Sequence, residues 1–436
     1  MDDSDQEWFA NEVNSILGKH MEVTFHSLCP NRVVPIFGDF MSPQGFYEDL
    51  VFDDLRQYIQ RQLDEYNSFP GMTRMNLVFF KEAIEHVSRI VRVISQPRGH
   101  MLNIGIGGSG RQVLTKLAAF ICEMGIFQIE VTKKYKTQEF KEDLKNLYKA
   151  TGVKQRATVF IFSGEQVAED TFLEIINNML STGEANLFKS DEFEELKAEL
   201  ERPAKKAGIQ FTTEHLYNFF MKCVRDNMHI CICLSPIGEA FRVYIRQYPA
   251  LINCTSPNWF RLWPQEALLE VAQKFLMGFE INTVVPGKED LENRDSLVEP
   301  TEVFLHRVVA YCFSVIHSSV STISDLMLAE VKRINYVTSP NYLELVSGYK
   351  QLLDFKRAEI SSSANKLRNG LSKIAETQEK VHIMSEELKI NSEKVKILAE
   401  ECEVFIAEIE EQKAITTEQK EMVAAEAVII HKEEIV

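Results

Sequence analysis

The sequence has few of the features that mark secreted, membrane-bound or metal-binding proteins. Its eight cysteines form no CxxC pair, the spacing typical of zinc sites and redox motifs. No apolar signal region follows the acidic start Met1–Asp5, and no apolar run approaches the roughly 20 residues of a membrane helix. We therefore expect a soluble intracellular protein with no membrane partner. Its cysteines, including Cys231 and Cys233 in one apolar run, should be reduced and buried.

Positive charge is also scarce. The chain has 48 Lys and Arg against 64 Asp and Glu, a formal net charge of -16. Nucleic-acid binding depends on clustered Lys and Arg that neutralise phosphates, so we expect no nucleic-acid partner. Hydrophobic residues make up 45% of the 436 residues, enough to bury a core, and the length suggests roughly three structural units.

Helical patterns dominate the first hundred residues. Ser4 and Glu7 have the spacing of a capping box, which predicts that a helix starts there. Apolar residues three and four apart predict a second helix over Phe52–Leu63 and a third after Asn76 that runs to Ile94. The third should end at Gln96–Pro97, because the residue before a proline disfavours the helical conformation.

Short apolar runs then alternate with amphipathic segments to about Phe275. The runs predict the strands Met101–Ile104, Phe127–Val131, Ala157–Phe162 and Met228–Leu234. Strands that alternate with helices are typical of a parallel sheet covered by helices on both faces. We therefore predict an α/β domain.

Helical periodicity returns from about Pro300 to Tyr349, which predicts a small helical lid domain. Beyond it the chain has no proline, and from Leu352 onward its only glycine is Gly370. One heptad frame places an uncharged residue at ten consecutive a positions: Leu367, Ile374, Val381, Leu388, Val395, Cys402, Ile409, Thr416, Val423 and Ile430. This pattern predicts a coiled-coil helix about 100 Å long, at ~1.5 Å per residue over roughly 70 residues. A homodimer or another helical segment should cover its seam.

The segment Gly105–Gln112 carries the main chemical signal, because it joins a predicted strand to a predicted helix. Gly105, Gly107 and Gly110 fit GxGxxG, and Glu130 follows at a distance suited to a ribose contact, which would indicate NAD binding. The same segment also fits a degenerate P-loop, GxxxxGK[ST], with Arg111 for lysine and Gln112 for Ser or Thr. A tight turn without a ligand is the third interpretation.

Several ordered stretches resemble the fourth AAA+ module of axonemal dynein heavy chains. They are Asn76–Val78, Ala83–Ile90, Gln96–His100 with Gly105–Gln112, Ile175–Glu184, Leu234–Gly238 with Phe241–Arg242, Arg246–Pro249, Asn258–Phe260 with Trp263–Pro264, Asn335–Thr338 and Tyr342–Leu345. Leu367–Leu371 is similar to the start of the family's microtubule-binding stalk. The resemblance implies an AAA+ P-loop domain with a helical lid and the outgoing stalk helix. It divides the chain into an entry segment (1–97), a large α/β domain (98–277), a lid (278–349) and the stalk helix (350–436).

The resemblance also implies a site for ATP or ADP formed by Gly105, Gly107, Gly108, Ser109, Gly110, Arg111 and Gln112. Mg²⁺ binding is in doubt, because Gln112 is a poor ligand for a hard cation and Gly164 stands where the family usually has aspartate. Glu165 could replace that carboxylate as a metal ligand or catalytic base, or be a solvated surface residue. We expect nucleotide binding with little hydrolysis.

Arg246 lies where the family offers an arginine finger to the nucleotide of the preceding module, although it could equally be a paired surface residue. The partners implied are neighbouring AAA+ modules, a returning stalk helix, dynein intermediate and light chains and, indirectly, microtubules. The implied location is the cytoplasm and the cytoskeleton of a ciliary or flagellar axoneme. An active ATPase module or a NAD-linked oxidoreductase remains the alternative.

Overall fold

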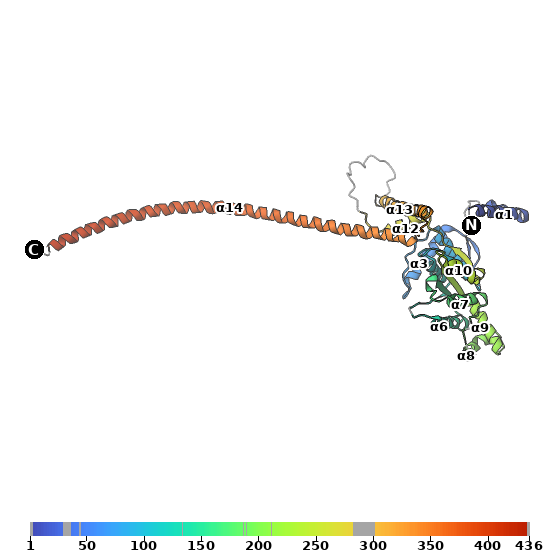
Figure 1. The fold of residues 1–436 in the computed structure, drawn as a ribbon. Helices are drawn as coiled ribbons and strands as arrows, with labels where there is room; N and C mark the ends of the chain where they lie inside the picture. The colour runs from blue at the N-terminus through green and yellow to red at the C-terminus, as the bar shows by residue number, and fades with distance from the viewer. Residues whose placement is uncertain are drawn as a thin grey trace. The chain divides into compact units, whose positions relative to one another are not determined.

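The computed structural model describes residues 3–28, 36–42, 45–132, 134–185, 187–188, 190–210, 212–281 and 301–433. Contacts within the chain divide it into two compact units, Met1–Gly348 and Tyr349–Val436. Each unit is considered by itself. Helices and strands are numbered in chain order, and Figure 1 labels several of the helices.

Helices and a small hairpin precede the sheet. The elements are α1 (Asp3–Met21), α2 (Phe25–Leu28), the antiparallel strands β1 (Ile36–Gly38) and β2 (Glu48–Leu50), α3 (Phe52–Ser68) and α4 (Lys81–Ile94). Helix α3 confirms the prediction over Phe52–Leu63. Helix α1 begins at Asp3, so Ser4 lies within its first turn and is not its N-cap. Helix α4 begins later than predicted, because Phe80 at its N-cap is extended and the preceding residues are not helical.

A five-stranded parallel sheet forms the centre of the first unit. Its strands are β3 (Met101–Ile104), β4 (Gly125–Gln128), β5 (Thr158–Ser163), β6 (Met228–Leu234) and β7 (Ser256–Trp259), in the spatial order β4-β5-β6-β3-β7. Every residue of β5 and β6 is buried, which is typical of central strands in a sheet covered on both faces. The predicted α/β fold with a parallel sheet is thus confirmed.

Helices cover the two faces of the sheet. They are α5 (Arg111–Ile121), α6 (Thr137–Tyr148) with the π-helical turn Lys149–Val153, α7 (Asp170–Ser181), α8 (Ser190–Lys206), α9 (Thr213–Asn227), α10 (Ala240–Gln247) and α11 (Ala250–Asn253), with a 3₁₀ turn at Gly164–Gln166. Alternation along each strand decides which face a side chain meets. Leu102 and Ile104 join the main apolar core with α6 and α7, whereas Asn103 between them contacts α5.

Two strand predictions need correction. Strand β4 covers Gly125–Gln128 instead of Phe127–Val131, because its register starts where Gly125 pairs with Thr158 of β5. Strand β7 was not predicted, since Ser256–Trp259 includes Pro257 and has no apolar run. A proline fits there because β7 is an edge strand. The free, buried state predicted for Cys231 and Cys233 is confirmed.

Two helices follow the sheet, α12 (Gln265–Leu276) and α13 (Thr301–Val331), and they pack side by side (Figure 1). The start predicted at Pro300 lies outside the described residues. Residues Phe304–Val331 of α13 are long and apolar enough, by length and composition alone, to cross a membrane, with a mean hydropathy of 1.3 and 17% of the residues buried over an 18-residue window. This corrects the expectation that no apolar run reaches that length. The helix also packs on the protein through Ala310 and Phe313.

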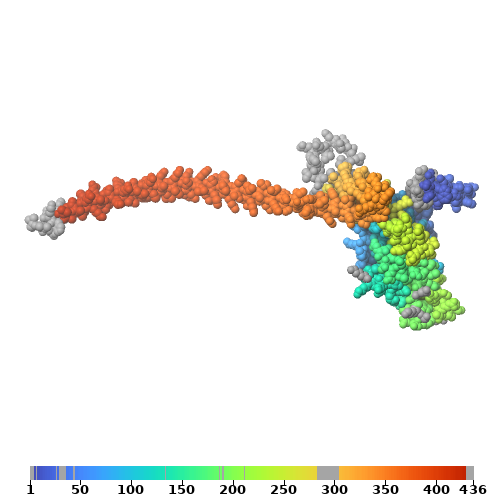
Figure 2. Space-filling view, in the orientation of Figure 1, coloured from blue at the N-terminus to red at the C-terminus, as the bar shows by residue number. Residues whose placement is uncertain are grey.

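Helix α14 runs from Ser339 to Glu433 without interruption. Its first residues belong to the first unit, where Tyr342 and Val346 are fully buried. In the second unit every residue from 358 to 428 is exposed, and Figure 2 shows these side chains uncovered along the helix. The side chain of Ile430 lies outside the described part. The exposed row of apolar a positions is what a coiled-coil helix without its partner presents.

Candidate functional site

The glycine-rich loop connects the C-terminal end of β3 to the first turn of α5. Gly108 and Gly110 have φ values of 76° and 89°, a region that side chains rarely adopt. Gly105 has a different reason to be glycine, because a Cβ there would lie 2.7 Å from Cβ of Phe260 and 2.9 Å from Oγ of Ser109. The loop therefore exposes backbone at the N-terminus of an 11-residue helix, where backbone N–H groups bind phosphate.

Two polar atoms at this loop are buried without a hydrogen-bond partner among the described residues: Oγ of Ser109 and Nη1 of Arg111. Buried polar atoms without partners are uncommon in native proteins and need an explanation. Burial lowers the pKa of Arg111, while nearby Cys233 and Glu165 oppose the shift. Even so, a guanidinium stays charged. A phosphate would provide acceptors for both atoms, so the residues present fit a nucleotide.

An apolar cavity of about 390 Å³ adjoins the loop, a volume within the range of small-ligand sites. Gly108, Ser109 and Gly110 line one side of it. The other walls come from the segment before α4, from α12 and from the first turns of α14, with Leu77, Val78, Val271, Phe275 and Leu343. Such a cavity beside a phosphate loop suits a flat, largely apolar base.

Helix α14 touches the loop directly. A Cβ placed on Gly108 would lie 2.0 Å from Cγ of Pro340, which is in the first turn of this helix. Two residues further, Tyr342 donates a hydrogen bond to the carbonyl of Leu268 in α12 at 2.7 Å. Pro340 and Leu343 were not predicted as site residues, because no local sequence pattern connects them to a loop more than 200 residues earlier.

The positions that hold Mg²⁺ in a P-loop carry poor metal ligands in this chain. The side-chain oxygen of Gln112 already accepts a long hydrogen bond, 3.4 Å, from Nε2 of Gln128. Gly164 has no carboxylate, and Glu165 beside it is exposed but close enough to influence Arg111. Within the described ranges, no three His, Cys, Asp or Glu residues cluster as metal ligands.

NAD binding would require the strand that precedes Glu130 to lie next to β3, and it does not. In the dinucleotide-binding fold the strand order is 3-2-1-4-5-6, so the first two strands are neighbours. Here β5 and β6 lie between β3 and β4, a separation of about 14 Å at ~4.8 Å per strand. Glu130 is also exposed, two residues beyond the end of β4. The sheet order therefore contradicts the NAD alternative.

Arg246 lies in the last turn of α10, away from the loop cavity. Its side chain is exposed, and it makes no hydrogen bond or ion pair to any described residue. The alternative of a surface arginine paired with an acid thus has no partner in this part of the chain. The guanidinium is free to meet an anion outside the unit.

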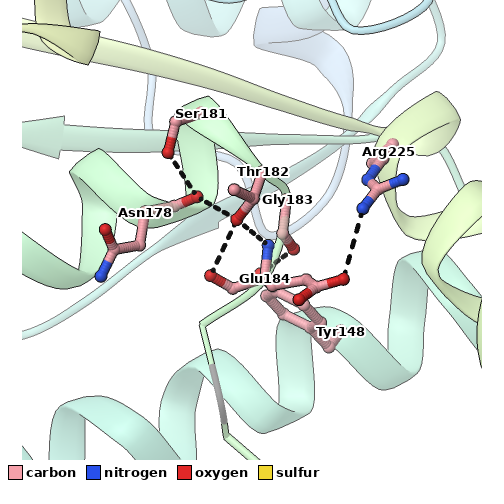
Figure 3. Close-up of polar contacts among 7 residues, drawn as sticks. All are labelled: Tyr148, Asn178, Ser181, Thr182, Gly183, Glu184 and Arg225. Carbon is pink, nitrogen blue, oxygen red and sulfur yellow. Dashed lines mark hydrogen bonds and ion pairs between the residues drawn. The ribbon is translucent and has the colours of Figure 1, made fainter.

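The turn that follows α7 is held by polar contacts from other elements (Figure 3). The hydroxyl of Tyr148 donates to the carbonyl of Gly183 at 2.8 Å, and Arg225 pairs with Glu184 at 3.5 Å. Arg225 also packs flat on Gly183, where a Cβ would lie 2.7 Å from Nε. These contacts fix the turn that leaves α7.

Together, the parallel sheet, the glycine-rich loop with its unpartnered Ser109 and Arg111, and the helices beside it define a P-loop nucleotide-binding module of the AAA+ class. Comparison with known proteins shows to which family of AAA+ proteins this module belongs. The profile of the family described as "P-loop containing dynein motor region D4" matches residues 75–352, and the chain belongs to this dynein family. The matched range includes α13, so that apolar helix is part of the dynein module.

Axonemal dynein heavy chains are among the most similar relatives. The chain is 50% identical over 381 residues to dynein axonemal heavy chain 2 of Mus musculus, and 49% identical over 381 residues to its Homo sapiens counterpart, in both cases with 87% of this chain covered. It is 43% identical over 385 residues, 86% of its length, to the dynein-1-beta heavy chain of the flagellar inner arm I1 complex of Chlamydomonas reinhardtii. The chain spans only 8% of the length of each of these relatives. The predicted axonemal, cytoskeletal location agrees with these relatives.

Proposed function

We propose that this chain is a nucleotide-binding structural and regulatory section of an axonemal dynein motor, which connects the AAA+ ring to the microtubule-binding stalk. ADP or ATP would bind at Gly105–Gln112, with its base in the cavity formed by Leu77, Val271 and Leu343. The observation that carries this proposal is the pair of buried, unpartnered donors on Ser109 and Arg111 beside that cavity. A bound nucleotide supplies the phosphate oxygens that both donors lack.

We further propose that hydrolysis at this site is slow. In a working P-loop a hydroxyl and an acidic residue hold Mg²⁺ at the phosphates. Gln112 offers only an amide oxygen that is already hydrogen-bonded to Gln128, and Gly164 offers no ligand. The opposing candidate is an active ATPase in which Glu165 serves as metal ligand or base. Its proximity to Arg111 favours that candidate.

The link to the stalk rests on the start of α14. Pro340 contacts the phosphate loop and Leu343 lines the cavity, so two residues at the beginning of this helix meet the nucleotide site. The uncovered seam of the second unit would pair with a returning stalk helix. Neighbouring AAA+ modules, intermediate and light chains and microtubules are the partners of the whole motor, and Arg246 would serve the preceding module's nucleotide. The four-part division at residues 97, 277 and 349 is part of the same proposal.

Binding of ADP and ATP to the purified chain, followed by calorimetry or by fluorescence of a labelled nucleotide, tests the site. Replacement of Arg111 by alanine removes a charge-assisted phosphate contact and should weaken binding by about tenfold or more. Arg92→Ala removes an exposed arginine of α4 and serves as the matched control. Equal affinity in the wild-type and Arg111→Ala chains would refute this assignment of the site.

A further inference from the structure

A continuous line of buried polar side chains crosses the sheet beneath the phosphate loop. His86 Nδ1 and Asn258 Oδ1 are 2.8 Å apart, Asn258 Nδ2 donates to Asn103 Oδ1 at 3.1 Å, and Asn103 Nδ2 donates to Thr115 Oγ1 at 3.1 Å. The hydroxyl of Thr115 then donates to the carbonyl of Arg111 at 2.7 Å. All four side chains are buried. We name this line the His86–Thr115 relay.

The donor and acceptor of each hydrogen bond follow from the bond between the Thr115 hydroxyl and the Arg111 carbonyl. Because the Thr115 hydroxyl gives its proton to Arg111, it must accept from Asn103, so the Asn103 amide has only one orientation that works. Asn103 then presents its oxygen to the amide nitrogen of Asn258. Asn258 in turn presents its oxygen to His86, which must carry its proton on Nδ1. Reversing any amide would leave buried polar atoms unpaired.

The relay joins the two ends of the phosphate loop. Asn103 lies in β3, two residues before Gly105, and Thr115 lies in α5, five residues after Gly110. A bond between them closes the base of the loop and holds the first turn of α5, which contains Arg111. Asn258 in β7 and His86 in α4 reach this base from the edge of the sheet.

His86 is well held at the far end. Its ring stacks on the ring of Phe260, with the two centroids 4.0 Å apart and an angle of 14° between the ring planes. Phe260 in turn packs against Gly105 at the start of the loop. Burial lowers the pKa of His86 to about 4, so its ring is neutral near pH 7 and its single ring proton can stay on Nδ1.

We propose that the His86–Thr115 relay positions the phosphate loop and Arg111 for the phosphates of ADP or ATP, with His86 acting through the two asparagines. The proposal rests on the proposed nucleotide function. Its four members do not touch the ligand; they preorganise the residues that do. The relay should therefore matter for the phosphate part of the nucleotide and not for the base in the adjoining cavity.

Variants of Thr115 test the relay, with ADP and adenosine as the two probes. Thr115→Val keeps the shape and removes the hydroxyl with both of its hydrogen bonds, to Asn103 and Arg111, and it should weaken ADP binding by about fivefold or more. Adenosine affinity should be unchanged, and Thr115→Ser should restore ADP binding. Thr151→Val is the matched control, because Thr151 is also fully buried and donates to the carbonyl four residues earlier, at 2.9 Å, away from the loop.

The proton on His86 gives a second measurement that a general loss of packing would not change. Two-bond ¹H–¹⁵N correlation spectra of the histidine-labelled chain should show the Nδ1–H form for the buried His86. His86→Phe keeps the stacked ring, removes the donor and should weaken ADP more than adenosine. An Nε2–H form, or equal losses for both probes, overturns the relay.

The two proposals fail in different ways. If ADP binds and Arg111→Ala weakens it but Thr115→Val does not, the relay is refuted and the nucleotide function stands. If the wild-type chain binds no ADP, the nucleotide function is refuted, and the relay proposal falls with it because there is nothing to position.

Discussion

Lowering the pH from 7 to 5 should weaken the folded state of the first unit, because two of its buried histidines resist protonation. His86 and His100 are 8% and 9% exposed. Burial lowers the pKa of each from 6.5 to about 4; the bond to Asn258 partly opposes this for His86, and His229 adds to it for His100. The unfolded chain therefore binds more protons than the folded chain between these two values, so stability falls as the pH falls.

The magnitude follows from the linkage between protonation and folding. For one group with a pKa of about 4 when folded and about 6.5 when unfolded, the loss between pH 7 and pH 5 is about 2 kcal/mol. Two such histidines lose about 4 kcal/mol together, a large part of the roughly 5–15 kcal/mol typical of a domain. His229 and His317 shift in the same direction and should add to the loss.

Urea unfolding curves at pH 7, 6 and 5 would measure this loss as a falling free energy of unfolding. In His86→Phe, the fall in the free energy of unfolding between pH 7 and pH 5 should be smaller by about 2 kcal/mol, whatever the stability of the variant at pH 7. His382→Ala removes an exposed histidine of α14 in the second unit and should not change the slope. A free energy of unfolding that is constant from pH 7 to pH 5 would show that these histidines are not buried as the structure has them.

Two further variants, one single and one triple, probe the loop and its missing metal ligands. Gly108→Ala should weaken ADP binding and lower the free energy of unfolding by more than Gly208→Ala does. Both glycines have φ above 70° (76° and 71°), but only a side chain at Gly108 would clash, with Pro340. Equal losses for the two variants in denaturation and binding assays would contradict that contact. Combining Arg111→Lys, Gln112→Thr and Gly164→Asp should raise Mg²⁺-dependent phosphate release, since the nearest atom to a Cβ on Gly164 is 3.4 Å away and the position has room for a side chain. Fast turnover by the wild-type chain that is lost in Arg111→Ala would show that the natural site is already active.

Sequence patterns predicted the parts of the fold in which neighbouring residues decide the structure. Strands β3 and β6 have their predicted residues, because each is a continuous apolar run buried on both faces. The heptad frame also predicted the exposed helix of the second unit, because the spacing of apolar residues along one segment is enough to indicate a coiled-coil helix. Strand β7 escaped prediction, since Ser256–Trp259 becomes a strand only by pairing with β3. Its alignment there is a property of the sheet and not of the segment.

The candidate site also contains residues that the local sequence reveals and residues that only the folded structure brings to it. The loop and Arg111 were visible in the sequence, because a strand, a glycine-rich turn and a helix are consecutive. The local pattern also allowed NAD binding, and only the sheet order, which sets strands far apart in the sequence side by side, decided against Glu130. Pro340, Asn258 and His86 act on the loop from three other elements, and no spacing in the sequence connects them to it.

The contact between Gly108 and Pro340 gives the start of α14 a physical reason to respond to the nucleotide. A phosphate bound at this loop would be held by groups of Gly108, Ser109 and Gly110, and Pro340 packs directly against the first of these three residues. Tyr342 and Val346, two and six residues after Pro340, are fully buried, so the first turns of the helix are held by packing. Close-packed interiors transmit small displacements instead of absorbing them. We therefore propose that a change in the loop's shape on nucleotide binding shifts the first turns of α14 against α12, where Tyr342 donates a hydrogen bond to the carbonyl of Leu268.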